Sequence, residues 1–537
     1  MLVAYFSPLA PTIILLLSAF ILPLLIKNVA HPLSQRFSGL IFLALVGLSL
    51  LTTRLNAPPH IISSWLFATS ELPTTLALQL TRLNFAFLGL TWWLLLIALL
   101  MTLPDEPDGA LTLPFYPRWF ILGATASLVF ISANEVTLGY AVITFDLCAA
   151  FYWFQRQQPH LGLGRLFLGI FTAIALIVAM PLAAVQPNWG LYLIGLALWL
   201  RFLLYPILEL DQPLIEIKSN LLTSLNHLIY FGLSFAVAVY IIIAVLQNPL
   251  PLPLRWLIVI TMLWQGILVW LKPSTDYKSA LIRLVFNQAA LLLLVDPLPP
   301  EIIIAYTIGL LLGLTALWVT PRVTKLPLSQ VWLYLSAAAA TLTLLGLPFS
   351  LGWSVKSAVY QLLFQASTPQ AGLVIVAVLA EGLVLSSLLL YWQFVFEADL
   401  TPTDGLIIPK NQWLANFMTW LPFLIPGVAI ISLSTLLQYT LPLTDFNHTR
   451  PVFIALSLTW LAAGGLGYYR PEILAYLRVS ERSLTPWLTF RWFTDGLKQI
   501  EALSRLLLHI QIILEGRHYF GWTFFVALVG FLAILLK

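Results

Sequence analysis

The sequence has few charged residues, a single cysteine and no segment with the composition of a water-soluble domain. Asp, Glu, Lys and Arg make up 9% of the 537 residues, hydrophobic residues make up 60%, and the mean hydropathy is +0.94. A soluble domain needs more polar surface than this, so the composition indicates an integral membrane protein. The lone cysteine, Cys148, excludes an iron–sulfur cluster, a cysteine-rich zinc site and an internal disulfide.

Two further absences narrow the function. The net charge of +4 is small and spread over loops, which argues against nucleic acid as a partner. The chain has no glycine-rich dinucleotide fingerprint, so we do not expect it to bind NADH or flavin. No loop carries a convincing catalytic set, which disfavours a membrane-bound transferase. Whether the chain takes part in an enzyme's reaction stays open at this point.

Apolar runs of roughly 18 to 25 residues recur along the chain, the length needed to cross a hydrocarbon core about 30 Å thick. We count about 14 to 16 and predict an all-α integral membrane protein. The first run is interpreted as a retained span, because no basic residue precedes it and no cleavage site follows it. The predicted spans lie near 9–26, 38–52, 84–103, 118–134, 137–155, 163–185, 189–208, 219–246, 253–271, 278–296, 301–319, 329–361, 369–397, 415–440, 451–470 and 517–537.

Basic residues are concentrated in loops after odd-numbered spans, for example at Arg36, Arg156, Arg165, Lys218 and Lys325. The positive-inside rule therefore predicts that these loops are cytoplasmic and that the N-terminus lies outside. We predict five segments: N-terminal spans (1–115), a first repeat (116–270), a second repeat (271–400), C-terminal spans (401–480), and a surface helix with a last span (481–537).

The region 191–232 differs from an ordinary span. An apolar run reaches Arg201, and Pro206 then interrupts the helix because it lacks an amide donor. The acidic patch that follows comprises Glu209, Asp211 and Glu216. The next apolar run contains the ionisable residue His227. Because ionisable residues inside membrane spans are costly and usually functional, the pattern predicts a broken helix that carries part of a proton path.

Three ionisable side chains in this half are candidates for proton transfer. Burial favours the neutral, protonated form of Asp146, whereas a nearby cation favours the carboxylate form. Because these two effects oppose each other, the side chain can exchange protons. Arg201 stays charged at physiological pH, and its predicted role is a fixed charge that holds Asp146 ionised. His227 belongs to a residue type that titrates near neutrality, which favours a relay. The structural alternatives are a hydrogen-bonding aspartate, a snorkelling arginine and a core histidine.

A second interrupted span precedes Lys356. Gly346, Pro348 and Gly352 break the run, and paired broken spans are typical of inverted-repeat transporters. A buried lysine can load and release a proton, so we predict that Lys356 does so. Further along, Glu381 is an acid in an otherwise apolar span. Two neutral amides that could hold water, or serve only core packing, are Asn287 and Gln288.

Residues 481–515 interleave charged and apolar side chains at helical spacing. This pattern predicts an amphipathic helix along the membrane surface, followed by the last span. A plain cytoplasmic loop with helical propensity is the alternative.

Several ordered stretches between roughly residues 115 and 400 resemble the antiporter-like subunits of respiratory complex I. These subunits recur in Mrp-type cation/proton antiporters, energy-converting hydrogenases and some inorganic-carbon uptake systems. SANEVTLGYAVITFD resembles the family stretch that ends in a membrane glutamate, with Asp146 in its place. LWLRFLLYP and LNHLIYFGL resemble the next two lysine-bearing segments, with Arg201 and His227 in place of the lysines.

The later half carries the closest part of the resemblance. LLGLPFSLGWSVKSAVYQLLF keeps the family's lysine as Lys356. TDYKSALIRLVFNQ resembles a family helix whose polar places are filled here by Asp276, Lys278 and Gln288. The surface helix with its final span resembles a lateral helix that braces neighbouring subunits in some members, although it is shorter. The His-Xaa-Trp-Leu-Pro-type sequence of the family is absent, and LELDQPL stands in its place, so the chain resembles a divergent branch.

The resemblance implies a proton-translocating subunit of a redox-driven membrane complex. Protons would pass from Asp146 with Arg201 to His227, Gln288 and Lys356, and Glu381 would be an exit. Flavin, iron–sulfur clusters and quinone are expected only in partner subunits. The expected partners are other membrane subunits and lipids, and the cargo is protons, with Na⁺ left open. The resemblance implies a bacterial inner membrane or a thylakoid. The alternatives are a scaffold that has stopped pumping and a membrane subunit for inorganic-carbon uptake.

Overall fold

The structure is a computed structural model. It describes residues 8–28, 32–52, 60–64, 75–102, 115–155, 158–210, 221–271, 277–295, 298–320, 331–348, 350–365, 371–399, 424–432 and 450–476. The first helices are α2 (Ala10–Asn28), α3 (Pro32–Thr52), α4 (Arg82–Met101), α5 (Phe115–Phe130), α6 (Glu135–Gln155), α7 (Pro159–Val185), α8 (Pro187–Trp199), α9 (Tyr205–Leu210) and α10 (Leu221–Val245). The later helices are α11 (Leu252–Leu271), α12 (Tyr277–Ala290), α13 (Pro300–Val319), α14 (Val331–Leu345), α15 (Leu351–Gln365), α16 (Ala371–Asp399), α18 (Arg450–Tyr468) and α19 (Arg470–Tyr476).

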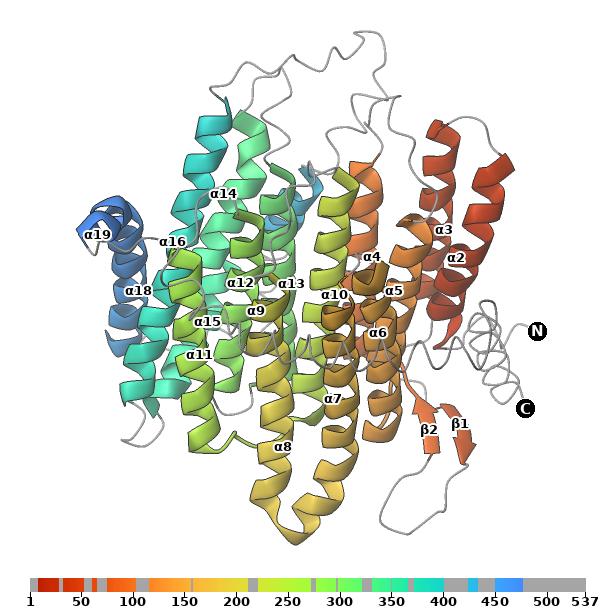
Figure 1. The fold of residues 1–537 in the computed structure, drawn as a ribbon, viewed down its shortest axis with the longest axis horizontal. Coiled ribbons are helices and arrows are strands. Elements are labelled where there is room, and N and C mark those ends of the chain that lie inside the picture. The colour runs from red at the N-terminus through yellow and green to blue at the C-terminus, as the bar shows by residue number, and fades with distance from the viewer. Residues whose placement is uncertain are drawn as a thin grey trace.

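The helices run side by side in one elongated bundle (Figure 1). Helices α2 and α3 form one edge of the view, α18 and α19 the opposite edge, and α10, α12 and α13 lie between them. Within the described residues, eight helices are long and apolar enough to cross a membrane. The predicted all-α membrane fold is therefore confirmed, and predicted and observed ends agree within a few residues, as for 137–155 and α6.

Apolar side chains cover the outer helices as well as the core. Phe20 on α2, Ile41 on α3, Phe167 on α7 and Leu461 on α18 are each more than half exposed. In water such side chains would be unfavourable, whereas lipid tails solvate them and every backbone group of a helix bonds internally. The bundle is thus built for a hydrocarbon solvent.

The helix break predicted before Lys356 is present, but the break predicted at Pro206 is wrong, because the helical backbone continues from Pro187 to Leu210 and is only distorted there. The span predicted at 189–208 consists of α8, a π-helical turn η1 (Leu200–Leu204) and α9, and Pro206 lies in the first turn of α9. The span predicted at 329–361 is two helices, because α14 ends at Leu345 and α15 begins at Leu351. A short 3₁₀ turn η3 (Leu291–Leu293) extends α12.

One segment predicted only as a loop contains strands. β1 (His60–Ser64) and β2 (Thr75–Leu78) form an antiparallel pair, and Leu78 also bridges to Ser132 at the α5–α6 junction. The Thr137 side chain accepts a hydrogen bond from the Ala77 amide at 3.0 Å, which ties the hairpin to α6. The predicted surface helix (481–515) and last span (517–537) lie outside the described residues, as does most of the span 415–440.

Candidate functional site: two buried ionic clusters

The first cluster is centred on Asp146 in the middle of α6, where the side chain is fully buried. Arg165 on α7 donates Nε–H to Oδ1 of Asp146 at 2.7 Å. Arg201 in η1 forms an ion pair with Oδ2 through Nη2 and donates Nε–H to the Thr172 hydroxyl at 3.1 Å. The predicted pairing of Asp146 with Arg201 is therefore present in the structure, together with a second arginine.

A second carboxylate completes this cluster. Glu209 near the end of α9 is buried, and its Oε2 lies 3.9 Å from Nη1 of Arg165. Its Oε1 accepts hydrogen bonds from Trp153 Nε1 at 2.7 Å and from the Tyr230 hydroxyl. Two arginines and two carboxylates thus form a group without net formal charge, which is how a low-dielectric interior tolerates ions.

The backbone makes room for these charges at two points. Gly169 on α7 lies against Asp146, and a Cβ built there would be 2.7 Å from the Cβ of Asp146, so α6 and α7 can approach closely. In η1 the backbone hydrogen bonds change from the α to the π pattern just before Pro206, and the Tyr205 amide bonds to the Leu200 carbonyl. This turn points the buried Arg201 side chain at Asp146.

The second cluster joins α15 to α16. Lys356 Nζ forms an ion pair with Oε1 of Glu381 and donates to the Leu344 carbonyl at 2.6 Å. The Tyr360 hydroxyl donates to Oε2 of Glu381 at 2.5 Å. All three side chains are buried, and the pair has no net formal charge. The two ionisable residues predicted separately in the later half are direct partners.

The broken end of α14 explains the position of Lys356. Gly346 has φ of +69° and the amides of Gly346 and Leu347 donate to the carbonyls of Thr343 and Leu342, the bonding pattern of a Schellman cap. The Leu344 carbonyl is left for side chains, and Lys356 binds it at the negative end of the helix dipole.

Gly352 belongs to the same break. A Cβ at this position would come within 1.8 Å of the Thr343 carbonyl oxygen, so only glycine lets α15 begin so close to the end of α14. The Leu345 carbonyl is bonded by Trp460 Nε1 at 2.9 Å. The break is therefore well supported rather than frayed.

Three buried amides lie between the two clusters along the fold. Gln265 on α11 donates to the Leu203 carbonyl of η1 at 2.8 Å, and Asn287 on α12 donates to the Met262 carbonyl at 2.8 Å. Gln288 donates at 2.7 Å to the Leu344 carbonyl that also binds Lys356. Because each NH₂ group faces a backbone carbonyl, each amide oxygen points elsewhere, and among the described residues none of the three oxygens accepts a hydrogen bond.

The remaining predicted residues occupy other positions. His227 on α10 is buried beside Tyr152 and Phe231, with ring centroids 5.9 and 6.3 Å away. Lys278 lies near the rings of Tyr277 and Trp318, 5.8 Å from each centroid. Asp276 lies outside the described residues. His227 thus neighbours the aromatic side of the first cluster, whereas Lys278 belongs to neither cluster.

Sequence reasoning missed two charged members of the first cluster. It counted Arg165 as a cytoplasmic loop charge, which the structure corrects, because the residue is buried in α7. It assigned Glu209 to an acidic patch after the broken helix, whereas the residue is buried and belongs to α9. The sequence did contain a signal for Arg165: Pro159 favours a helix start at its own position, which places Arg165 nearly two turns inside an apolar helix.

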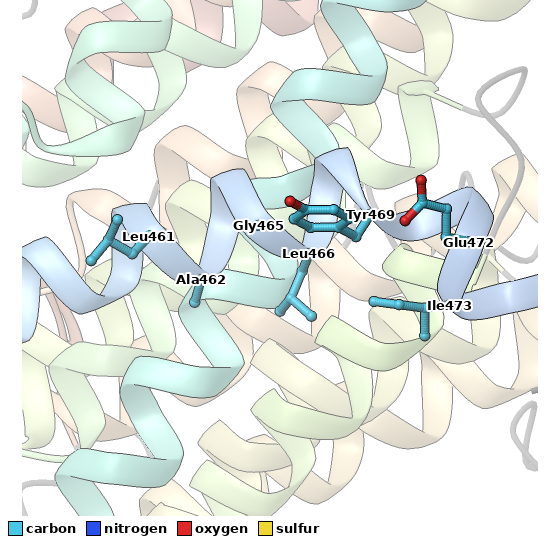
Figure 2. Close-up of a pocket in the computed structure, with 7 residues that line it drawn as sticks. All are labelled: Leu461, Ala462, Gly465, Leu466, Tyr469, Glu472 and Ile473. Atoms are coloured by element: carbon cyan, nitrogen blue, oxygen red, sulfur yellow. The ribbon is translucent and has the colours of Figure 1, made fainter. Parts of the chain in front are cut away.

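A shallow groove at the edge of the bundle is separate from these clusters. It is lined by residues of α18 and α19, including Leu461, Leu466 and the acid Glu472, and by Tyr469 between the two helices (Figure 2). Among the described residues, no group of three or more His, Cys, Asp or Glu side chains could hold a metal ion. The two ionic clusters are therefore the candidate functional site.

Comparisons with solved structures identify chains of similar fold. A chain of the Mrp complex from Dietzia sp. has a TM-score of 0.62 and 15% identity, over 98% of this chain and 62% of that chain. A chain of respiratory complex I from Thermus thermophilus with bound aureothin has a TM-score of 0.52 and 16% identity, over 82% of this chain and 100% of that chain. The present chain thus spans less than two thirds of the Mrp chain. No protein-family model and no curated protein sequence matches it.

These likenesses bear on the fold. At such low identity they show a shared architecture, and they confirm the fold that the resemblance to antiporter-like membrane subunits implied.

Proposed function

We propose that this chain is a proton-translocating, antiporter-like subunit of a multi-subunit, redox-driven membrane complex, such as a complex I-like NADH/quinone oxidoreductase. The observation that carries the proposal is the pair of buried, charge-balanced clusters, one at the π-helical turn before Pro206 and one at the break between α14 and α15. Ions buried in a membrane protein are costly to retain and typically mark ion pathways.

The second cluster has the chemistry for proton exchange. Lys356 and Glu381 can each bind or release a proton, so the buried pair can exist as two ions or as two neutral groups. An arginine–carboxylate pair lacks this choice, because a guanidinium stays protonated. We therefore assign proton loading to Lys356 and an exit role to Glu381.

The proposed route follows the row of polar residues through the bundle. It runs from the first cluster, where Asp146 pairs with Arg201, through His227 and then Gln288, to Lys356. In this route Arg201 acts as a fixed charge that holds Asp146 ionised. The free oxygens of Gln265, Asn287 and Gln288 can accept hydrogen bonds from water molecules that bridge the clusters.

Coupling to partners would be electrostatic. A change of charge in a neighbouring subunit would alter the pairing of Asp146 with its arginines, and with it the proton affinity of His227 and Lys356. Electron donors, flavin, iron–sulfur clusters and quinone would belong to partner subunits, in a bacterial inner membrane or a thylakoid.

Proton uptake by proteoliposomes of the purified parent complex tests the proposal. In complexes that assemble and keep redox activity, Lys356→Ala and Asp146→Asn should lower proton transfer by about a hundredfold. Lys356→Arg is the sharper variant, because it keeps the positive charge and removes the exchangeable proton. Glu301→Gln changes an exposed acid in the first turn of α13 and serves as the control.

Unchanged proton transfer in Lys356→Ala and Asp146→Asn would favour the scaffold alternative. Bicarbonate uptake that depends on a soluble zinc-bearing partner would favour the inorganic-carbon alternative.

A further inference from the structure

The two carboxylate oxygens of Glu209 differ in their hydrogen bonds: Oε1 accepts hydrogen bonds and Oε2 accepts none from the described residues. Trp153 and Tyr230 both donate to Oε1, and among the described residues Oε2 accepts no hydrogen bond. The nearest cationic atom recorded for Oε2 is Nη1 of Arg165, at 3.9 Å, beyond hydrogen-bond distance. The side chain is 1% exposed, so this open oxygen is buried. A proton on Oε2 would therefore break none of the hydrogen bonds that hold the carboxyl group.

Asp146 is held in the opposite way. Arg165 donates to its Oδ1 and Arg201 to its Oδ2. Protonating either oxygen would disrupt an ion pair with a group that cannot give up its own charge. In this arrangement Asp146 is an anion with no free position, whereas Glu209 has one.

Arg165 connects the two carboxylates. Its Nε–H binds Asp146, its Nη2 donates to the Ser234 hydroxyl at 2.9 Å, and its Nη1 is the nitrogen nearest Glu209. The rings of Phe145, Tyr205 and Tyr230 lie 5.4 to 5.7 Å from the guanidinium carbon. These aromatic faces stabilise the guanidinium in its position between the two carboxylates.

The charged and titratable groups on the elements packed around Glu209 are known from the described residues. They include Asp146, Cys148 and Tyr152 on α6, His160 and Arg165 on α7, Arg201 in η1, Tyr205 on α9 itself, His227 and Tyr230 on α10, and Tyr277, Lys278 and Arg283 on α12. With Glu209 ionised, the four charges of the first cluster cancel, and with Glu209 neutral, one positive charge remains. A proton on Glu209 therefore changes the field at Asp146 and Arg201.

The position of Glu209 favours exchange with one side of the membrane. Its partner Trp153 lies in the last turn of α6, so the carboxyl group is displaced from mid-helix Asp146 toward the C-terminal end of α6. His227 contacts Tyr152, which stacks on Tyr230 at 4.8 Å. His227 and Glu209 thus lie on two sides of one aromatic group.

We propose that Glu209 is the proton-exchanging carboxyl group of the first cluster and that Arg165 is the positioning residue that transmits its change of charge to Asp146 and Arg201. This inference rests on the proposed function. An O–H bond forms at Oε2 when a proton arrives and breaks when the same proton leaves, and no electron is transferred. Asp146 stays ionised throughout.

Infrared difference spectroscopy of the purified full chain, titrated with acid, tests this assignment directly. The C=O stretching band of a protonated carboxyl group should appear in the wild type, lose its Glu209 component in Glu209→Gln, and persist in Asp146→Asn. Glu381→Gln separates any component from the second cluster. A spectrum of Glu209→Gln identical to that of the wild type would overturn the inference.

Trp153→Phe provides a second measurement that keeps the carboxyl group. It removes one of the two donors to Oε1, so the band should shift to higher frequency. An unshifted band would show that the titrating carboxyl is not Glu209, even if Glu209→Gln failed to fold.

Proteoliposomes of the parent complex then link the group to transport. Glu209→Gln should lower proton uptake by about a hundredfold, Glu209→Asp should restore part of it, and Glu301→Gln should leave it unchanged. If the wild type moves protons and Glu209→Gln moves them equally, the inference fails and the proposed function stands. If the wild type moves none, the proposed function fails, and the infrared band alone decides whether Glu209 exchanges a proton.

Discussion

At the scale of single residues, the first cluster depends on Arg165 more than on any other side chain. This arginine neutralises part of two buried carboxylates, whereas Arg201 contacts one. Removing one member of a buried ionic group leaves an uncompensated charge, which costs more than the group contributes when complete. The loss of Arg165 would leave Glu209 without its nearest cation.

Arg165→Met should therefore destabilise the chain by about 3–5 kcal/mol. Glu209→Gln in the same chain removes the stranded charge, so the double variant should be more stable than the sum of the single changes by about 1–3 kcal/mol. Thermal unfolding of the four proteins in detergent measures this coupling. Arg165→Met combined with Glu381→Gln, a change in the other cluster, should be additive, and an equal coupling there would contradict the pairing.

Some residues of the two clusters could be predicted from the sequence more easily than others. Lys356, Glu381 and Asp146 are isolated charges deep inside apolar runs, and hydropathy alone makes them stand out. Arg165 and Glu209 lie near the ends of their apolar runs. At such a position the sequence alone does not distinguish a charged side chain that faces the protein interior from one in a loop. Their assignment needed the side-chain direction, which depends on packing between helices.

At the scale of elements, the distorted and broken helices support the charges they carry. The Schellman cap at Gly346 bonds two of the last carbonyls of α14, and Lys356 with Gln288 binds a third. In the sequence, glycine and proline marked the break between α14 and α15, and Pro206 marked the helix that contains the π turn. The π turn at Leu200–Leu204 and the β1–β2 hairpin were not predicted, because neither has a distinct composition and both depend on tertiary contacts.

Gly346→Ala should destabilise the chain by about 1–2 kcal/mol, because an alanine at φ of +69° is strained. The added Cβ would also lie 2.7 Å from Cδ of Lys356 and displace the side chain from its partners. Gly464→Ala on α18 is the matched control, since its Cβ would meet nothing within 4 Å, and it should raise stability by up to about 1 kcal/mol. Thermal unfolding distinguishes these opposite signs, and equal shifts would argue against the cap.

At the scale of the whole molecule, the two charge-balanced clusters lie at different places in one bundle. The proposed function requires protons to pass from one cluster to the other. The three amides on α11 and α12 share one arrangement: a donor bound to a backbone carbonyl and a buried oxygen left open. A buried acceptor without a hydrogen bond is costly, so packing alone does not explain three amide oxygens in this arrangement. Bridging water would satisfy all three oxygens and join the clusters.

Gln288→Leu should therefore slow proton transfer by about tenfold while every charged residue stays in place. The Leu344 carbonyl keeps Lys356 as a donor, so the second cluster should remain assembled. Asn84→Leu on α4 is the control, because Asn84 is a buried amide whose NH₂ group donates to the Gln79 carbonyl outside this row. Asn84→Leu also removes the hydrogen bonds that the Asn84 oxygen accepts from Thr81 and Tyr240, so it should cost at least as much stability, but only Gln288→Leu should slow proton uptake by proteoliposomes. Equal transfer rates in the two variants would mean that the clusters exchange protons by another route, because the control loses at least as many buried hydrogen bonds but lies outside the row of amides.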